Sequence, residues 1–198
     1  KIISRRHSYH GATLGAHSVT GRGDFSELRN SGFETIRISP PFDVFHKGEH
    51  QPTGTLIDIE EAILFEGKEN IAAILFEPVN HLKGMHPSEN NYIKGVRALC
   101  DKYNILMITD EIVTGIGRSG RFLYTHHANV CPDIVVLGKG LSGGYTPASV
   151  VISNQKVSER FTTTNPWTKC NYSHTYAANP ISIVAIGTSL QYLDTLEK

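Results

Sequence analysis

An acidic side chain and an amine each stand at the end of an apolar stretch of this sequence. Residues 106–109 run into Asp110, and residues 134–137 run into Gly138 and Lys139. Apolar, β-branched runs that end in charge are typical of buried strands in a parallel sheet. Because such sheets bind ligands at the carboxyl ends of their strands, we expect Asp110 and Lys139 to meet at one edge. The carboxylate could keep a pyridine nitrogen protonated, and the amine could form a Schiff base with a carbonyl cofactor.

Each of these two residues also has an ordinary structural explanation. The segment around Lys139 is not a phosphate-binding P-loop, because Asp133 stands where the first glycine belongs and Gly140 follows the lysine. A lone lysine between glycines is usually a surface residue in a loop. A carboxylate pair such as Asp110-Glu111 can simply cap the next element or bind a metal. Neither residue alone indicates a cofactor site, but Asp110 followed by Lys139 in this order favours one.

Strand-like and helix-like segments alternate around these residues, which predicts an α/β protein with a mostly parallel sheet. Turns rich in glycine, proline and polar residues separate the segments. We expect strands at residues 1–4, 35–39, 71–76, 105–109, 134–137 and 148–152, helices at 12–19, 56–65, 91–103 and from Asn179-Pro180 onward, and loops at 21–32, 43–55, 80–90 and 162–173.

Composition excludes several classes of function. The chain has 198 residues, about one domain, and its formal net charge is zero, which gives no electrostatic case for nucleic acid or an anionic membrane. No apolar run approaches the roughly 20 residues of a membrane span. Three distant cysteines favour a reducing compartment, the cytoplasm. Neither His7 with His10 nor His126 with His127 has the spacing of metal ligands, so we expect no metal.

Many short stretches of the chain together resemble the class III aminotransferases, which are fold-type I pyridoxal-phosphate enzymes. Any one of them is weak, but they follow the family order over nearly the whole chain. The matching stretches are Tyr9-His10-Gly11, Glu77-Pro78-Val79, residues 99–103, residues 110–120, residues 132–134, residues 138–145 with Pro147, and Thr175-Tyr176 with Asn179-Pro180.

The resemblance implies catalytic and ring-binding roles for four of these residues. Lys139 would carry the Schiff base with pyridoxal 5'-phosphate and then move the substrate proton. Asp110 would pair with the pyridine nitrogen. Tyr9 would stack on one face of the ring and Ile112 would pack on the other, although both could be ordinary packed residues.

Three further residues receive supporting roles from the same resemblance. Thr175 would reach the cofactor phosphate of a neighbouring subunit, or it could be a loop hydroxyl that bonds the backbone. Glu77 would support the ring, with a strand-end cap as an equally weighted alternative. His10, with Gly11, would shape the turn at the cofactor.

The resemblance also implies a three-layer sandwich, with residues 1–198 as the cofactor-binding large domain of a longer chain. The family's phosphate loop upstream of Tyr9 and its C-terminal small domain do not occur in this sequence. Val113 replaces a frequent glutamine, and Leu82 replaces the second glutamate of the ornithine-type members. The missing loop leaves the source of the phosphate contacts open, Val113 cannot bond the ring oxygen of the cofactor, and Leu82 argues against the ornithine-type subgroup.

The function implied is transamination between a small-molecule amino donor and a carbonyl acceptor, in a homodimer with shared sites. Two alternatives stay open. One is another reaction on the same scaffold, an aminomutase, racemase or decarboxylase. The other is a truncated, non-catalytic interaction module.

Overall fold

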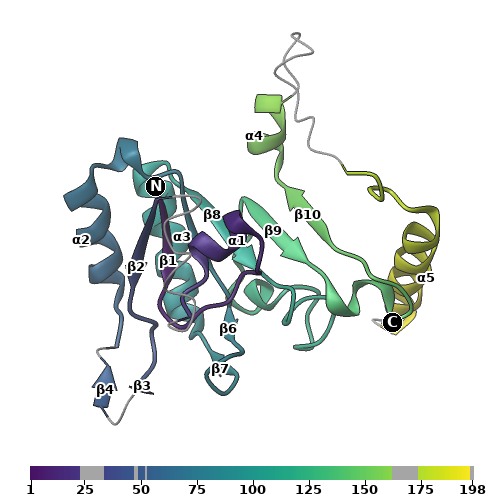
Figure 1. Cartoon of the computed structure of the whole chain (residues 1–198), viewed down its shortest axis with the longest axis horizontal. Coiled ribbons are helices and arrows are strands. Elements are labelled where there is room, and N and C mark those ends of the chain that lie inside the picture. Colours follow the sequence, from purple (N-terminus) through teal and green to yellow (C-terminus); the bar gives the residue numbers. More distant parts are fainter. Residues whose placement is uncertain (23–33, 47–48, 52, 162–173, 197–198) are drawn as a thin grey trace.

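The computed structural model describes residues 1–22, 34–46, 49–51, 53–161 and 174–196, and its central feature is a six-stranded sheet (Figure 1). The strands lie in the order β10-β9-β8-β5-β1-β2. All neighbours pair in parallel except β10, which runs antiparallel to β9. The strands are β1 (Ile2–Arg5), β2 (Thr35–Ile38), β5 (Ala73–Phe76), β8 (Leu106–Asp110), β9 (Ile134–Leu137) and β10 (Val150–Ser153). The predicted α/β class and the mostly parallel sheet are confirmed.

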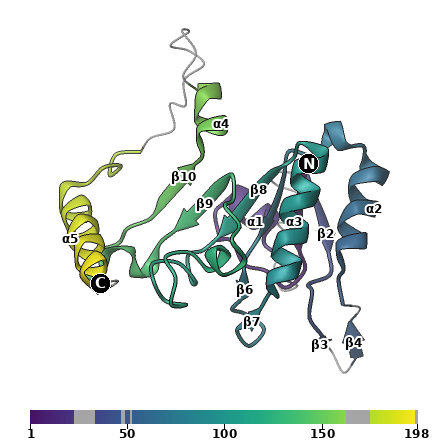
Figure 2. The ribbon, with the colours of Figure 1, turned by 180° about the vertical axis from the view of Figure 1, so that it is seen from behind.

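Helices α2 (Leu56–Glu66) and α3 (Asn90–Tyr103) cover one face of the sheet, and the short helix α1 (Leu14–Val19) lies on the other (Figures 1 and 2). Periodic apolar residues direct one stripe of each long helix inward, where Ile59, Ile63 and Ile93 are fully buried. They pack in one cluster with residues of β1, β5 and β8. Helices therefore flank the parallel strands on both faces.

Two short hairpins lie where we expect only loops. Strand β3 (Val44–His46) pairs with β4 (Glu49–Gln51), and β6 (Val79–Asn80) pairs with β7 (His86–Pro87). The loop predictions for residues 43–55 and 80–90 are wrong at these positions. Strands of two or three residues are too short for alternation of polar and apolar residues to reveal them. Most of the loop predicted at 21–32, and all of that at 162–173, falls outside the described residues.

Single helical turns connect the main elements, and a last long helix follows them. The short elements are η2 (Lys68–Asn70), η3 (Tyr124–Ala128), η4 (Lys139–Ser142), α4 (Gln155–Ser158) and η5 (Glu159–Phe161). Helix α5 (Pro180–Leu196) begins as predicted, because the Asn179 side chain accepts hydrogen bonds from the N–H groups of Ile181 and Ser182.

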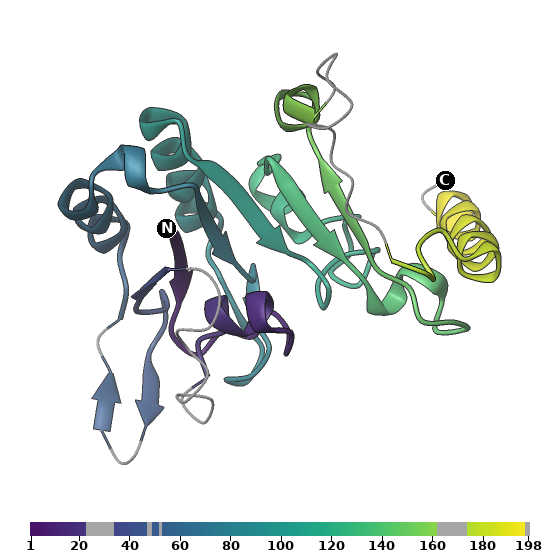
Figure 3. The same ribbon diagram turned by 45° about the horizontal axis from the view of Figure 1, so that its top comes forward.

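Helix α5 lies beyond β10, at the end of the molecule opposite α2 (Figure 3). It has no buried residue, although Ile186 and Leu193 pack against a small cluster that includes Leu137 and Leu141. In the part of the chain that the structure describes, no helix is both long and apolar enough to traverse a bilayer.

Candidate active site

Four neighbouring strands end in polar residues at one edge of the sheet. β1 ends at Arg5, β8 ends at Asp110, and β5 and β9 are followed by Glu77 and by Gly138-Lys139. The strands are parallel, so these ends lie together. Asp110 and Lys139 therefore lie at one edge of the sheet, as expected from the sequence.

The turn after β1 places Tyr9 and His10 over this edge. The Ser8 hydroxyl donates to the Arg5 carbonyl oxygen at 2.7 Å, and the Asn80 side-chain amide donates to the His7 carbonyl oxygen at 2.8 Å. His7 has a positive φ of 64°, a conformation that few non-glycine residues adopt. The turn is thus fixed by side chains from within it and from the neighbouring β6.

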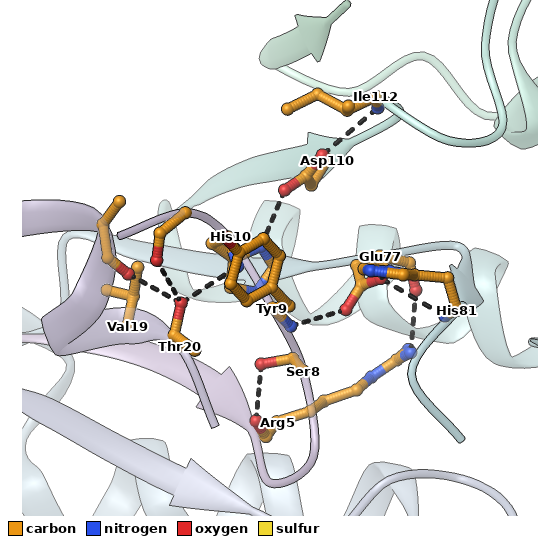
Figure 4. Close-up of polar contacts among 12 residues, drawn as sticks. Arg5, Ser8, Tyr9, His10, Val19, Thr20, Glu77, His81, Asp110 and Ile112 are labelled. Carbon is orange, nitrogen blue, oxygen red and sulfur yellow. Dashed lines mark hydrogen bonds and ion pairs between the residues drawn. The ribbon is translucent and has the colours of Figure 1, made fainter. Parts of the chain in front are cut away.

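Asp110 is held from two directions (Figure 4). Its Oδ2 lies 2.9 Å from Nδ1 of His10, and its Oδ1 accepts a hydrogen bond from the Ile112 N–H at 3.2 Å. The side chains of His10 and Asp110 are only 3% and 8% exposed. Nε2 of His10 is buried and has no hydrogen-bond partner among the described residues. His10 therefore does more than shape the turn, because it contacts the carboxylate directly.

Lys139 begins the single turn η4 immediately after β9. Its φ is 47°, in the left-handed region that costs a non-glycine residue roughly 1 kcal/mol or more. Strain of this kind accumulates at functional sites when the surrounding structure maintains it. The lysine is solvent-exposed, unlike Asp110. Its amine is therefore accessible while the carboxylate is enclosed.

A small pocket of about 70 Å³ joins these side chains. Asp110 lies between Ile112 on one side and the Tyr9–His10 segment on the other (Figure 4). Lys139 borders the same pocket. The complete lining consists of Tyr9, His10, Gly11, Glu77, His81, Asp110, Ile112, Val113 and Lys139.

Glu77 forms the pocket wall beside Tyr9. This glutamate is 4% exposed, and its Oε1 accepts a hydrogen bond from the Tyr9 N–H at 2.8 Å. Its Oε2 lies 2.5 Å from Nδ1 of His81. The buried Arg5 side chain donates to the Glu77 carbonyl oxygen at 3.0 Å and lies over the Phe76 ring. Glu77 thus supports the turn that carries Tyr9, and its contacts extend beyond those of a strand-end cap.

The residue after Asp110 anchors the following loop. Glu111 is fully buried and accepts hydrogen bonds from the Thr114 hydroxyl, the N–H groups of Tyr124 and Thr125, and the Thr125 hydroxyl. Four hydrogen bonds satisfy this buried carboxylate. They fix the segment that begins with Ile112, so Glu111 serves structure next to the pocket.

The structure brings six of the seven predicted site residues to one pocket and leaves one outside it. Thr175 is exposed and does not line the pocket. On its other side, Lys139 borders a groove of about 980 Å³ between Thr146–Val150 and the start of α5. His81 lines the pocket but carries no sequence signal, because its contacts depend on the turn between β6 and β7. In the described ranges, no three His, Cys, Asp or Glu side chains gather as metal ligands do.

The pocket chemistry fits a flat heteroaromatic ring with a basic nitrogen and an aldehyde. An aromatic wall at Tyr9 and an aliphatic wall at Ile112 suit the two faces of a ring. The enclosed Asp110 suits a protonated ring nitrogen, and the accessible amine of Lys139 suits an aldehyde. The pocket lining offers no cluster of cations or aliphatic hydroxyls for a phosphate.

Comparisons with known proteins agree on one family. The sequence model described as aminotransferase class-III matches residues 1–197. The adenosylmethionine-8-amino-7-oxononanoate aminotransferase of Staphylococcus aureus is 33% identical over 189 residues, which cover 91% of this chain and 41% of that protein. The diaminobutyrate–2-oxoglutarate transaminase of Halomonas elongata is 35% identical over 167 residues, covering 80% of this chain and 36% of that protein.

Solved structures that resemble this chain are also transaminases. An amine transaminase from an uncultivated Pseudomonas species, solved in its PLP-bound form, superposes with a TM-score of 0.88 at 27% identity. The superposition covers 100% of this chain and 46% of that one. The chain thus spans less than half the length of the relatives that it matches.

Proposed function

This chain belongs to the class-III aminotransferase family, and from that premise we propose that the protein is a pyridoxal-phosphate-dependent aminotransferase. It would move an amino group from an amine or amino-acid donor to a keto or aldehyde acceptor, with residues 1–198 as its cofactor-binding large domain. One observation carries the proposal. Asp110 ends one strand and Lys139 follows another, and both border the same pocket.

Pyridoxal phosphate, when bound, supplies an aldehyde that can join an amine and a ring that withdraws electrons from the substrate carbon. Asp110 would hold the protonated ring nitrogen through its carboxylate. His10 and the Ile112 N–H already orient that carboxylate, so no reorganisation is needed when the ring enters.

Lys139 is the residue that we propose for proton transfer. Its Nζ would hold the cofactor through the aldehyde, and as a free amine it would carry the proton that leaves the donor carbon. The position of Lys139 supports this role. The residue is solvent-exposed, lies in a strained turn at the end of a strand, and borders the pocket. Tyr9 and Ile112 would bound the two ring faces and keep water from them.

We propose a homodimer in which Thr175 of one subunit reaches the phosphate held by the other. The exposure of Thr175 supports this assignment, because its hydroxyl is available to a second chain. The apolar side chains of Ile181 and Val184 on α5, 73% and 68% exposed, would be covered in the dimer.

We propose a cytoplasmic location because the described cysteines are free thiols. Cys100 is free and buried, and Cys131 is free and exposed. Free thiols of this kind are stable in a reducing compartment.

Two charge-removing variants with matched controls test the function. In the complete protein, Lys139→Ala should abolish both product formation and the Schiff-base absorbance that wild type keeps after unbound pyridoxal phosphate is removed. Asp110→Asn should lower kcat about 100- to 1,000-fold, because it removes the charge that faces the ring nitrogen. Neither Lys156, which donates to Asn104, nor Asp101, which pairs with Arg97, lines the pocket, so Lys156→Ala and Asp101→Asn should both retain activity.

Product analysis separates the reactions possible on this scaffold. Incubation with an amino donor and a keto acid should yield a new amino acid in equal amount to the deaminated donor. Carbon dioxide release or isomerised donor would instead indicate a decarboxylase, a racemase or an aminomutase. A wild-type protein that retains no Schiff-base absorbance once unbound pyridoxal phosphate is removed would contradict every reaction of this class and favour a non-catalytic interaction module.

A further inference from the structure

We propose that His81 is a positioning residue that fixes Tyr9 at the pocket, acting through the carboxylate of Glu77. The inference rests on the proposed function of this pocket. It adds a residue that sequence reasoning does not select and that the resemblance does not assign. Three contacts carry it: one between His81 and Glu77, one between Glu77 and Tyr9, and one between the His81 and Tyr9 rings.

The first contact ties the imidazole to the buried glutamate. Nδ1 of His81 lies 2.5 Å from Oε2 of Glu77, and the His81 backbone N–H points at the same oxygen from 3.4 Å. With the proton on Nδ1, the ring donates to the carboxylate. The Glu77 side chain is 5% exposed, so it depends on protein donors rather than on water.

The second contact passes this constraint to the turn. The other Glu77 oxygen, Oε1, accepts the hydrogen bond from the Tyr9 N–H at 2.8 Å. A carboxylate is planar and rigid, so fixing Oε2 also fixes the direction of Oε1. Loss of the imidazole would free the carboxylate to rotate toward solvent, and the Tyr9 N–H would lose a charge-assisted partner.

The third contact acts on the ring itself. The rings of His81 and Tyr9 pack edge to face, with centroids 5.9 Å apart and planes at 79°. Figure 4 shows Glu77 and His81 together on one side of Tyr9, while Asp110 lies above it, toward Ile112. His81 therefore constrains both the backbone and the ring of the residue that we expect to stack on the cofactor.

A second histidine of the same hairpin provides a matched comparison. His86 is also half-buried and also stacks on an aromatic ring, Phe42, at 4.6 Å between centroids. Unlike His81, it does not line the pocket. A general loss of hairpin stability would follow from changing either histidine, whereas a positional effect on Tyr9 would follow only from changing His81.

The experiment compares His81→Ala, His81→Asn and His86→Ala in the complete protein. The asparagine amide can donate from nearly the position of Nδ1, so it should rescue the contact with Glu77. Three readouts are measured: hydrogen exchange at the Tyr9 amide without cofactor, the Kd of pyridoxal phosphate, and the circular dichroism band of the bound cofactor. Wild type and Lys139→Ala are included to test the proposed function itself.

We expect His81→Ala to speed exchange at the Tyr9 amide, weaken cofactor binding about tenfold and alter the dichroism band. His81→Asn should stay within about threefold of wild type, and His86→Ala should match wild type in all three. The inference is overturned if His81→Ala leaves the Tyr9 amide and the cofactor unchanged, or if His86→Ala produces the same losses. Failure of wild type to bind cofactor would instead count against the proposed function, with the exchange data alone deciding the role of His81.

Discussion

The two ends of the sheet differ in how completely the chain covers them. Around β1, β5 and β8, helices α2 and α3 bury a core in which Ile3, Ile63 and Met107 have no solvent exposure. Beyond β9, strand β10 exposes Val151 and α5 has no buried residue at all. The two residues of the candidate site differ in the same way. Asp110 is buried at the covered end of the sheet, whereas Lys139 is exposed to solvent next to the uncovered end.

This contrast indicates which half of the site the chain builds alone. Asp110, His10, Glu77 and Tyr9 are connected by hydrogen bonds among residues far apart in sequence. On the lysine side, hydrogen bonds join Thr146 and Pro147 to Ser182, but none among the described residues reaches the Lys139 side chain, and its groove opens between residues 146–150 and the start of α5. The carboxylate half is thus preorganised, whereas the lysine half borders an open groove.

The largest difference between the two ends should appear in unfolding measurements. On this chain, Ile63→Ala should lower the free energy of unfolding by about 2–5 kcal/mol, because it leaves a cavity in the covered core. Val184→Ala should change it by less than about 0.5 kcal/mol, because Val184 is 68% exposed. Urea titrations of both variants give the comparison.

The same two variants can be compared in the complete protein. If a second subunit covers α5, Val184→Ala should weaken dimerisation of the complete protein, although it leaves the stability of this chain alone unaffected. Equal costs for the two substitutions on this chain would contradict the division into a covered and an uncovered end.

An intermediate effect should come from the charge network at the opposite edge of the sheet. Burial disfavours the charge of Asp133, but hydrogen bonds from the Met107 N–H, Arg97 and Asn154 outweigh it and lower the pKa of this carboxyl. Asp133→Asn should cost about 2–3 kcal/mol at pH 7.

The pH dependence of that loss follows from its sign. A lowered pKa in the folded state stabilises the protein above the ordinary pKa of 3.8, and the contribution disappears as pH falls through the lower value. The gap between wild type and Asp133→Asn should therefore be constant above about pH 5 and shrink below pH 4. A gap that widens on acidification would rule out this network as the source.

The smallest effect is a difference in reactivity between two thiols, which is measured on the wild-type fold without a destabilising substitution. Burial raises the pKa of the Cys100 thiol to about 12, whereas Cys131 is exposed. Cys170 lies outside the described residues, so it is replaced by serine for this test. At pH 8, Ellman's reagent should label Cys131 rapidly and Cys100 only after denaturation. Rapid native labelling of Cys100 would show that the covered end opens easily.

Local patterns predicted the elements that end in the site. Continuous apolar runs indicated β8 and β9, and Asn179 before a proline indicated the start of α5. The carboxylate and the amine could therefore be placed at one edge before the structure was known. The same patterns could not show that Lys139 adopts a left-handed conformation, since that depends on the turn around it.

Contacts between distant residues could not be predicted. The His10–Asp110 pair joins a turn to a strand 100 residues later, and no local spacing encodes it. His81 is four residues after Glu77, but it begins the turn after strand β6, so helical spacing has no meaning there. The two hairpins escaped prediction because their strands are too short to show a period.

The central claim is that Asp110 and Lys139 share one pyridoxal ring, and reductive trapping tests it most directly. The complete protein is incubated with pyridoxal phosphate, reduced with borohydride, digested and mapped by mass spectrometry. We predict one stable adduct, on the peptide that contains Lys139, in wild type and in Lys156→Ala. In Asp110→Asn the same adduct should need a much higher cofactor concentration. An adduct on another lysine, or one that is indifferent to Asp110, would contradict the account.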